Sequence, residues 1–173
     1  SSPAPTWPLC CSRSPGLAWV VAGRDVPPCG AGLTAAFADG CTSQGVDVVD
    51  LGLISTDAAY YAAGSLDAPA AMFTASHNPA KYNGIKLCLA GAKPVGQDTG
   101  LVDIKEMIEA GDIPPATTRG TSSELSILDA FAAHLRSFVV IGTLRPLTVV
   151  ADTAPGMGAR VAATLLAGRP FEL

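Results

Sequence analysis

The residues that could do chemistry are concentrated in one short segment, between Thr74 and Lys86. Within it, Ser76 is followed directly by His77, and Lys81 and Lys86 supply two positive charges further along. A serine hydroxyl next to an imidazole can attack an acyl group, as in the serine hydrolases. It can also carry a phosphoryl group, whose charge of about −1.5 to −2 requires cationic and hydrogen-bonding neighbours. Both chemistries are open on these residue types alone.

The adjacency of Ser76 and His77 favours the phosphoryl chemistry. Successive residues of an extended segment point to opposite sides, so we expect His77 to be badly placed to take the proton of Ser76. The surrounding sequence lacks the G-x-S-x-G turn of α/β hydrolases, and nothing in it indicates an Asp or Glu that would orient His77. A serine hydrolase is therefore the weaker hypothesis. The non-functional alternative is that Ser76 only caps the loop beside Asn78 and Pro79.

The segment is expected to follow a buried strand at the carboxyl end of a sheet, where loops present side chains to ligands. Short apolar runs predict strands at 17–22, 46–51, 70–74 and 84–88. Apolar residues with helical spacing predict helices at about 33–45, 56–64 and 98–111. Strands that alternate with helices are typical of a layered α/β domain. Pro79 removes a backbone donor and disfavours helix at Asn78, so the loop should have a defined shape.

Composition changes divide the chain into four parts. Residues 1–16 are rich in Pro, Ser and Cys and show no period, so they are predicted to be irregular. Residues 17–112 are predicted to form the α/β domain that carries the Ser76 loop, and the Pro/Thr-rich residues 113–120 to form a linker. Residues 121–173 are predicted to be an incomplete second α/β domain. It would begin with a capping box at 121–124 before a helix, followed by a strand at 147–151 and a helix at 157–167.

The overall composition argues against several functions. The net charge of −4 and the lack of a Lys/Arg stripe argue against a nucleic-acid partner. The five cysteines have neither C-x-x-C nor paired-His spacing, so neither a zinc site nor a disulfide framework is predicted. Cys41 and Cys88 fall on apolar faces and are expected to be reduced core thiols, which suits a cytoplasmic protein. No apolar run reaches the roughly 18 residues of a membrane span, and the N-terminus lacks the order of a signal peptide.

Four segments carry a resemblance to a known family. The loop around Ser76 closely resembles the phosphoserine loop of the phosphohexomutases, a family that includes phosphomannomutases and phosphoglucomutases. The resemblance lies in the sequence T-A-S-H-N-P at 74–79 and in Y-N-G-I-K at 82–86. Residues 23–25 resemble the family's G-R-D segment, residues 50–56 its D-x-G-x-x-x-T segment, and residues 152–158 its glycine-containing segment at the start of the second domain. The resemblance runs from about Val20 to the end of the chain. It implies a layered mixed β-sheet with helices on both faces, followed by the opening of a second, similar α/β domain.

The resemblance also implies a function and roles for individual residues. Members of the family are sugar-phosphate mutases, intramolecular phosphotransferases that pass a phosphoryl group from a phosphoserine to a hexose phosphate and take one back from the resulting bisphosphate. By resemblance, Ser76 is the phosphoserine, and one of its phosphate oxygens helps to bind Mg²⁺. His77 lies beside the transferring group, and Lys86 is a general acid/base or charge stabiliser. Arg24 and Asn78 would support the phosphate, and an activator of the glucose 1,6-bisphosphate type would prime Ser76.

The chain also departs from the family's pattern. It lacks the early aspartate-isoleucine/valine-arginine-glycine segment, and residues 1–19 do not resemble the helix that precedes the G-R-D strand. The D-G-D-x-D metal loop, the sugar-selecting loop and the later phosphate-binding loop are not found either. Mg²⁺ requires close to six oxygen ligands, which Ser76 alone cannot supply. We therefore expect a fragment that does not turn over by itself. The alternative is a non-catalytic α/β fragment that at most binds phosphate or a partner.

Overall fold

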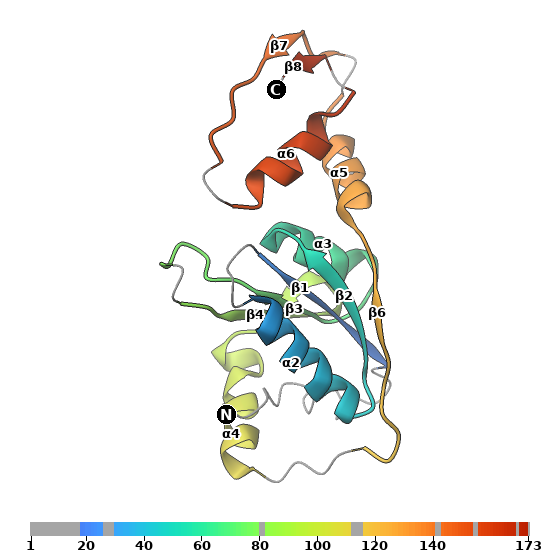
Figure 1. Ribbon diagram of the computed structural model, residues 1–173, viewed down its shortest axis with the longest axis vertical. Coiled ribbons are helices and arrows are strands. Elements are labelled where there is room, and N and C mark those ends of the chain that lie inside the picture. Colours follow the sequence, from blue (N-terminus) through green and yellow to red (C-terminus); the bar gives the residue numbers. More distant parts are fainter. Residues whose placement is uncertain are drawn as a thin grey trace.

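A six-stranded sheet forms the centre of the molecule (Figure 1). The computed structural model describes residues 18–25, 30–79, 82–111, 116–140, 143–153, 156–168 and 170–172. The irregular segment expected at 1–16 lies outside these residues. The order of the strands across the sheet is β5-β4-β3-β1-β2-β6. Their bounds are β1 Trp19–Arg24, β2 Asp47–Leu53, β3 Ala70–Phe73, β4 Ile85–Leu89, β5 Lys93–Pro94 and β6 Ser122–Glu124.

The sheet is mixed, as the family resemblance implied. β1 pairs in parallel with both β2 and β3, and β6 is parallel to β2. β4 is antiparallel to β3, and β5 is antiparallel to β4. The central strands β1 and β3 are almost wholly buried, because helices cover the sheet on both sides. The carboxyl ends of β1 and β3 and the start of β4 therefore meet at one edge of the sheet.

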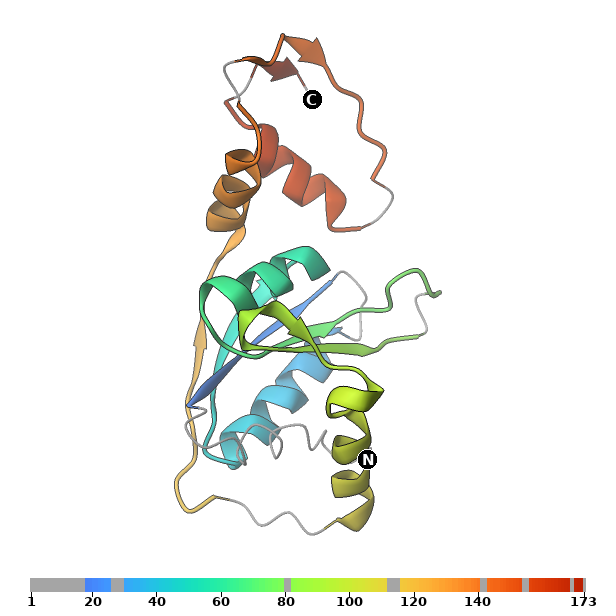
Figure 2. The same cartoon turned by 180° about the vertical axis from the view of Figure 1, so that it is seen from behind.

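Helices cover the two faces of the sheet (Figures 1 and 2). α2 (Gly30–Ser43) and α4 (Leu101–Ala110) lie on one face, and α3 (Thr56–Ser65) lies on the other. On the α2 face, Phe37 and Phe73 are fully buried and meet edge to face, with ring centroids 5.5 Å apart. The α3 face is lined by small side chains, the buried alanines 58, 59, 62 and 63. Two short 3₁₀ helices, η1 (Ala90–Ala92) and η2 (Gln97–Thr99), lead into α4.

The capping box predicted at 121–124 is wrong, because these residues pair with the sheet. β6 runs parallel to β2, with Ser122 opposite Val48. The carboxylate of Asp47 accepts hydrogen bonds from the backbone N–H of Thr121 (2.6 Å) and from its hydroxyl (2.8 Å). These two hydrogen bonds lower the pKa of Asp47 below its ordinary value. The last strand of the sheet thus comes after the segment expected to be a linker, and the division of the chain into domains stays a prediction.

The elements after β6 form a smaller group. They are α5 (Leu128–Ser137), α6 (Gly158–Leu166) and the parallel pair β7 (Leu147–Thr148) and β8 (Phe171–Glu172). The guanidinium of Arg136 on α5 donates to the carbonyl oxygens of Thr164 and Leu165 in the last turn of α6, at 3.1 and 3.3 Å. Cationic groups stabilise this end of a helix, because its last carbonyls have no partner within it. That these elements open a second α/β domain stays a prediction.

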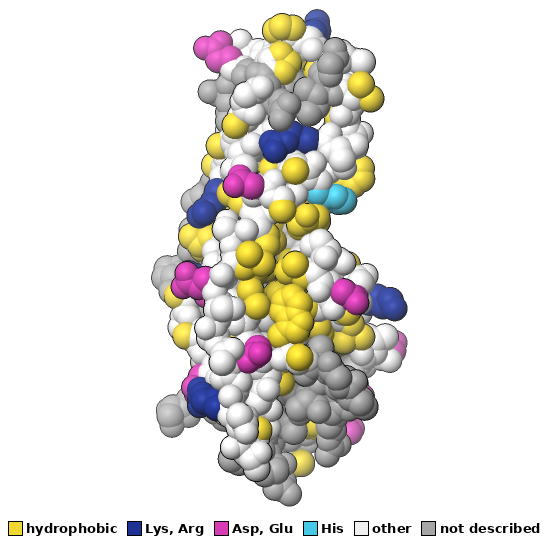
Figure 3. Space-filling model, turned by 90° about the vertical axis from the view of Figure 1, so that its right-hand side faces the viewer, with side chains coloured by type: hydrophobic (Ala, Val, Ile, Leu, Met, Phe, Trp, Pro, Cys, Tyr) yellow, Lys and Arg dark blue, Asp and Glu magenta, His cyan; other side chains and the backbone are white. Residues whose placement is uncertain are grey.

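Aromatic contacts join α5 to α3. The rings of Tyr61 and Phe131 lie 5.6 Å apart, and the exposed His134 lies 4.9 Å from Tyr61 and 4.8 Å from Phe138. Figure 3 shows hydrophobic side chains gathered near the middle of one face of the molecule. None of the described helices is long and apolar enough to cross a membrane.

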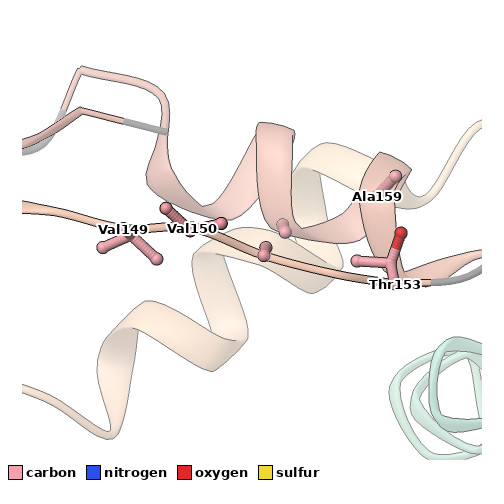
Figure 4. Close-up of a pocket in the computed structure, with 6 residues that line it drawn as sticks. Val149, Val150, Thr153 and Ala159 are labelled. Carbon is pink, nitrogen blue, oxygen red and sulfur yellow. The ribbon is translucent and has the colours of Figure 1, made fainter.

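An open cavity of about 310 Å³ lies between α6 and the segment that follows β7. Figure 4 shows Val149, Val150, Thr153 and Ala159 around it, and Ala151 and Ala162 complete its lining. These side chains carry no charge, so the cavity offers no cation to balance a phosphate group.

Candidate functional site

The Ser76 loop leaves the sheet at the edge where β1, β3 and β4 meet. Arg24 at the end of β1 lies opposite Phe73 at the end of β3, and Phe73 lies opposite Ile85 at the start of β4. Pairing continues past the strand ends, because the N–H of Asp25 donates to the carbonyl of Phe73 (3.0 Å) and the N–H of Thr74 donates to that of Gly84 (3.0 Å). The beginning of the loop is therefore anchored to a strand on each side.

Ser76 occupies the corner of a tight turn. The N–H of Asn78 donates to the carbonyl of Ala75 at 3.0 Å, which closes the turn around Ser76 and His77. Ser76 has a φ of 54°, in the left-handed region that a residue with a side chain enters at a cost of about 1–2 kcal/mol. Ala75 is buried, whereas Ser76, His77 and Asn78 are exposed. The turn therefore projects the Ser76 side chain into solvent from a fixed base.

The hydroxyl of Ser76 and the ring of His77 lie close together. The distance between Ser76 Oγ and His77 Nδ1 is 3.3 Å. The expectation that the two side chains point apart is therefore wrong, because it assumed an extended segment and the positive φ of Ser76 bends the chain. Among the described residues, no carboxylate bonds to His77, so the group that would orient it in a Ser-His-acid triad is not seen there. His77 can exchange a proton with a group on Ser76, but these residues do not form a hydrolase triad.

A hydrogen-bond chain reaches Ser76 from β1. The hydroxyl of Thr74 donates to the carboxylate of Asp25, through Oδ2, and accepts from the backbone N–H of Ser76 at 2.8 Å. Sequence reasoning assigned no role in the site to either Asp25 or Thr74. The sequence does contain one local indication of the bond between Thr74 and Ser76. Thr74 lies two residues before Ser76, and a Thr hydroxyl readily accepts a hydrogen bond from the backbone N–H two residues later.

A family-level comparison matches the part of the chain that contains this turn. The family model for domain I, the alpha/beta/alpha domain, of phosphoglucomutase/phosphomannomutase matches residues 12–113, which is more than half of the chain and includes the whole Ser76 turn. The chain belongs to the phosphoglucomutase/phosphomannomutase family.

Individual relatives extend the likeness beyond that domain. A phosphomannomutase of Salmonella montevideo is 39% identical over 140 residues, which cover 79% of this chain and 31% of that protein. A phosphomannomutase of Escherichia coli is 37% identical over 162 residues, which cover 89% of this chain and 36% of that protein. A solved structure of a phosphoglucomutase/phosphomannomutase family protein from Burkholderia thailandensis has a TM-score of 0.77 at 28% identity, covering 94% of this chain and 36% of that one. The chain thus spans about a third of the length of these relatives.

Arg24, Lys86 and Asn78 were also expected at the phosphohexomutase site, and they lie at the same edge of the sheet. Within the described part of the chain, none of their side chains forms a hydrogen bond or ion pair with Ser76. The guanidinium of Arg24 forms an ion pair with Asp50 on β2, 3.6 Å away, rather than bonding to the Ser76 loop. Lys86 lies on β4 opposite Met72, with an exposed side chain. Asn78 contributes its backbone N–H to the turn. Lys81, noted in the sequence, lies outside the described residues.

The acidic residues of the described chain do not make a magnesium site by themselves. Nowhere in this part of the chain do three or more His, Cys, Asp or Glu side chains lie close enough to hold a metal ion. Mg²⁺ is held by oxygen ligands in a near-octahedral arrangement. The described residues therefore do not fit the ion without further ligands, and we derive no chemical step through it.

The two cysteines of the described chain, Cys41 and Cys88, are buried. Burial raises the pKa of Cys88, since the thiolate would lose its hydration. Cys88 lies on β4 opposite Ala70, inside the α3-side core. It is a packing residue and takes no part in the Ser76 site, as expected from the sequence.

Proposed function

We propose that this chain is the phosphoserine-bearing part of a sugar-phosphate mutase that interconverts hexose 6-phosphates and 1-phosphates. The observation that carries the proposal is the presentation of Ser76 from a strained, anchored turn at the carboxyl edge of the sheet, within the region that matches the family. A positive φ at a residue other than glycine persists only where the surroundings enforce it, and such residues cluster at functional sites. Glycine would fit this corner without strain, but it would lack the hydroxyl.

The proposed reaction moves one phosphoryl group out and another back. In the first half, a hydroxyl oxygen of the hexose phosphate attacks the phosphorus carried by Ser76. The new P–O bond to the sugar forms as the bond to Ser76 Oγ breaks, and the proton lost by the sugar hydroxyl is balanced by one gained at Ser76 Oγ. The second half is the reverse, with the other phosphoryl group of the bisphosphate returning to Ser76. Such transfers depend mainly on positioning and on charge stabilisation.

The side chains around Ser76 have distinct proposed roles. His77, with Nδ1 3.3 Å from Ser76 Oγ, is placed to hold the proton at that oxygen. Lys86 is the proposed acid/base or charge stabiliser for the sugar hydroxyl. Asn78 and Arg24 are proposed to support phosphate, and Arg24 would have to exchange its contact with Asp50 to do so. A hexose phosphate is the proposed substrate, and a hexose 1,6-bisphosphate would prime Ser76.

Mg²⁺ is proposed to bind a phosphate oxygen on Ser76, together with ligands beyond the described residues, and would neutralise phosphoryl charge when bound. Because the described residues do not form that site alone, we propose that the isolated chain accepts a phosphoryl group without sustained turnover. The proposed location is the cytoplasm, where a buried thiol such as that of Cys88 stays reduced.

A pulse–chase experiment tests the proposal. The chain is incubated with glucose 1,6-bisphosphate labelled in its phosphoryl groups and is then chased with unlabelled glucose 6-phosphate. We expect label on the wild-type protein and on Ser65→Ala, an exposed serine at the end of α3, but none on Ser76→Ala. Labelling of Ser76→Ala at the wild-type level would contradict the assignment. The chase should move the label from Ser76 to the sugar phosphate once. No label on the wild-type protein would favour the alternative, a non-catalytic fragment that at most binds phosphate or a partner.

A further inference from the structure

The Asp25–Thr74–Ser76 hydrogen-bond chain has a direction that its chemistry fixes. An ionised carboxylate only accepts hydrogen bonds, and a threonine hydroxyl has a single proton to donate. The bond between Thr74 Oγ1 and Asp25 Oδ2 therefore uses the proton of Thr74. A lone pair of Thr74 Oγ1 is then left facing the N–H of Ser76, which donates to it at 2.8 Å. Asp25 thus orients the acceptor that holds the Ser76 amide.

The same amide belongs to the residue with the unfavourable backbone conformation. Ser76 has a φ of 54°, and its N–H is held by Thr74, a residue that is 6% exposed. Without that bond, the peptide preceding Ser76 would be free to rotate toward the ordinary negative φ. Such a rotation would move the hydroxyl of Ser76 away from its present position. The fixed Thr74 hydroxyl is therefore a direct restraint on where the reacting oxygen lies.

The second oxygen of Asp25 is a buried acceptor that the bond to Thr74 does not use. Asp25 Oδ1 is excluded from solvent and has no hydrogen-bond partner among the described residues. Leaving a buried acceptor unpaired is unfavourable, so a carboxylate retained in this position calls for an explanation, and a positioning role is one. An Asp elsewhere in this sheet provides a contrast, since Asp47 bonds to both donors of Thr121 with one oxygen and lies at the surface.

We propose that Asp25 is a positioning residue for Ser76 and acts through the hydroxyl of Thr74. Its importance for phosphoryl transfer rests on the function proposed above, whereas its effect on the Ser76 amide does not. Asp25 touches neither the phosphoryl group nor the sugar in this scheme. It keeps the Thr74 hydroxyl turned toward Ser76, so that Ser76 stays in the left-handed conformation in which its oxygen is presented. A reacting atom displaced by about 1 Å can cost about a hundredfold in rate.

The test follows the backbone amide of Ser76 by NMR in the full 173-residue chain. Hydrogen exchange and the ¹H–¹⁵N resonance position are measured in Asp25→Ala, in the milder Asp25→Asn, and in Thr74→Val, which removes the hydroxyl at nearly constant volume. Thr74→Ser restores the hydroxyl and is the rescue variant. Asp47→Ala is the matched control, because it breaks an Asp–Thr pair at the far end of the same sheet. Thermal unfolding of each variant separates local from global effects.

We expect the Ser76 amide to exchange about three- to tenfold faster in Asp25→Ala and Thr74→Val, which is the range set by loss of one hydrogen bond. Thr74→Ser and Asp47→Ala should exchange as the wild type does, although Asp47→Ala is less stable overall. If Asp25→Ala does not fold, the same shift is expected in Asp25→Asn, because a neutral amide is a weaker acceptor. An unchanged Ser76 amide in folded Asp25 and Thr74 variants, or an equal change in Asp47→Ala, would overturn the proposal.

Phosphoryl labelling separates this inference from the proposed function. From labelled glucose 1,6-bisphosphate, Thr74→Val should take up label at least about tenfold more slowly than wild type, and Thr74→Ser should recover most of the rate. If the amide responds as expected but the wild type takes up no label, the positioning role stands and the proposed function fails. Equal labelling rates in wild type and Thr74→Val would overturn the claim that the restraint serves the reaction.

Discussion

Replacing Gly120 with alanine tests whether β6 completes the sheet. A Cβ atom on Gly120 would lie 2.4 Å from the carbonyl oxygen of Val46 and 2.6 Å from its carbonyl carbon. Carbon atoms do not approach backbone atoms this closely, and a backbone obstacle cannot be relieved by a change of rotamer. The segment leading into β6 would have to move away from the start of β2.

The size of the effect follows from the hydrogen bonds next to Gly120. Its own N–H donates to the carbonyl of Thr42 (2.8 Å), the N–H of Thr121 donates to Asp47 (2.6 Å), and the N–H of Val48 donates to the carbonyl of Thr121 (2.8 Å). Each such bond contributes about 0.5–1.5 kcal/mol net. Losing all three would lower the free energy of unfolding by about 2 to 4 kcal/mol.

Urea unfolding followed by circular dichroism measures this change. With a slope of about 2 kcal/mol per molar urea, the midpoint of Gly120→Ala should fall by about 1 to 2 M. Gly32→Ala is the control, because its Cβ would point into open space within α2 and should be neutral or stabilise by up to about 1 kcal/mol. An unchanged midpoint in Gly120→Ala would refute the placement of β6 against β2.

Two further predictions concern groups with shifted pKa values. The Thr121 hydrogen bonds lower the pKa of Asp47 from 3.8, so its ionised form stabilises the fold fully above pH 3.8 and this contribution is lost as the pH falls through the lowered value. The urea midpoint of Asp47→Asn should therefore lie below that of the wild type at about pH 7, and the difference should shrink as the pH falls below 3.8; a difference that stays constant with pH would contradict this reading. Burial raises the pKa of Cys88, so its thiolate is scarce. Alkylation of Cys88 by iodoacetamide, mapped by peptide mass, should be at least about tenfold slower in the native chain than in urea, and equal rates would show that the thiol is not buried.

The central strands could be predicted from the sequence because their burial leaves a strong signal. The apolar runs at 46–51, 70–74 and 84–88 match β2, β3 and β4 to within two residues. β3 is buried at all four positions, so its apolar run predicts a strand whichever neighbour it pairs with. β2 and β4 are buried only in part and include Asp50 and Lys86, and their shorter apolar stretches were still sufficient for the prediction. The helix predicted at 56–64 was equally visible, and Ser55 caps it by accepting from the N–H of Ala58 at 3.2 Å.

β6 could not be predicted because nothing apolar marks it. Its three residues, Ser122–Glu124, are all exposed at the edge of the sheet. They are held by backbone pairing with β2 and by the side chain of Asp47, which lies 74 residues before Thr121 in the sequence. The same residue types are also typical of a helix N-cap, because Ser, Thr and Glu side chains form hydrogen bonds with nearby backbone groups both at helix caps and in extended segments.

The candidate site was located from sequence, but its internal geometry was not. The sequence predicted that the Ser76 loop follows a buried strand, and the loop does follow β3. The chemical roles of its residues stay a prediction. The positive φ of Ser76 could not be predicted, because no glycine at that position indicates it. The short distance between the His77 ring and the Ser76 hydroxyl, which follows from that φ, could not be predicted either. The bond between Asp25 and Thr74 joins residues 49 positions apart and depends on β1 and β3 being neighbours. Local spacing carries no information about such a pairing.

The role of Ser76 as phosphoryl carrier is tested most directly by the mass of the chain after incubation with glucose 1,6-bisphosphate, followed by peptide mapping. We expect a gain of one phosphoryl group, located on the peptide that contains Ser76 and absent from Ser76→Ala, which keeps the Cβ and therefore the same backbone preference. No gain in mass, or a phosphoryl group mapped to another residue, would contradict the claim that Ser76 is the phosphoryl carrier.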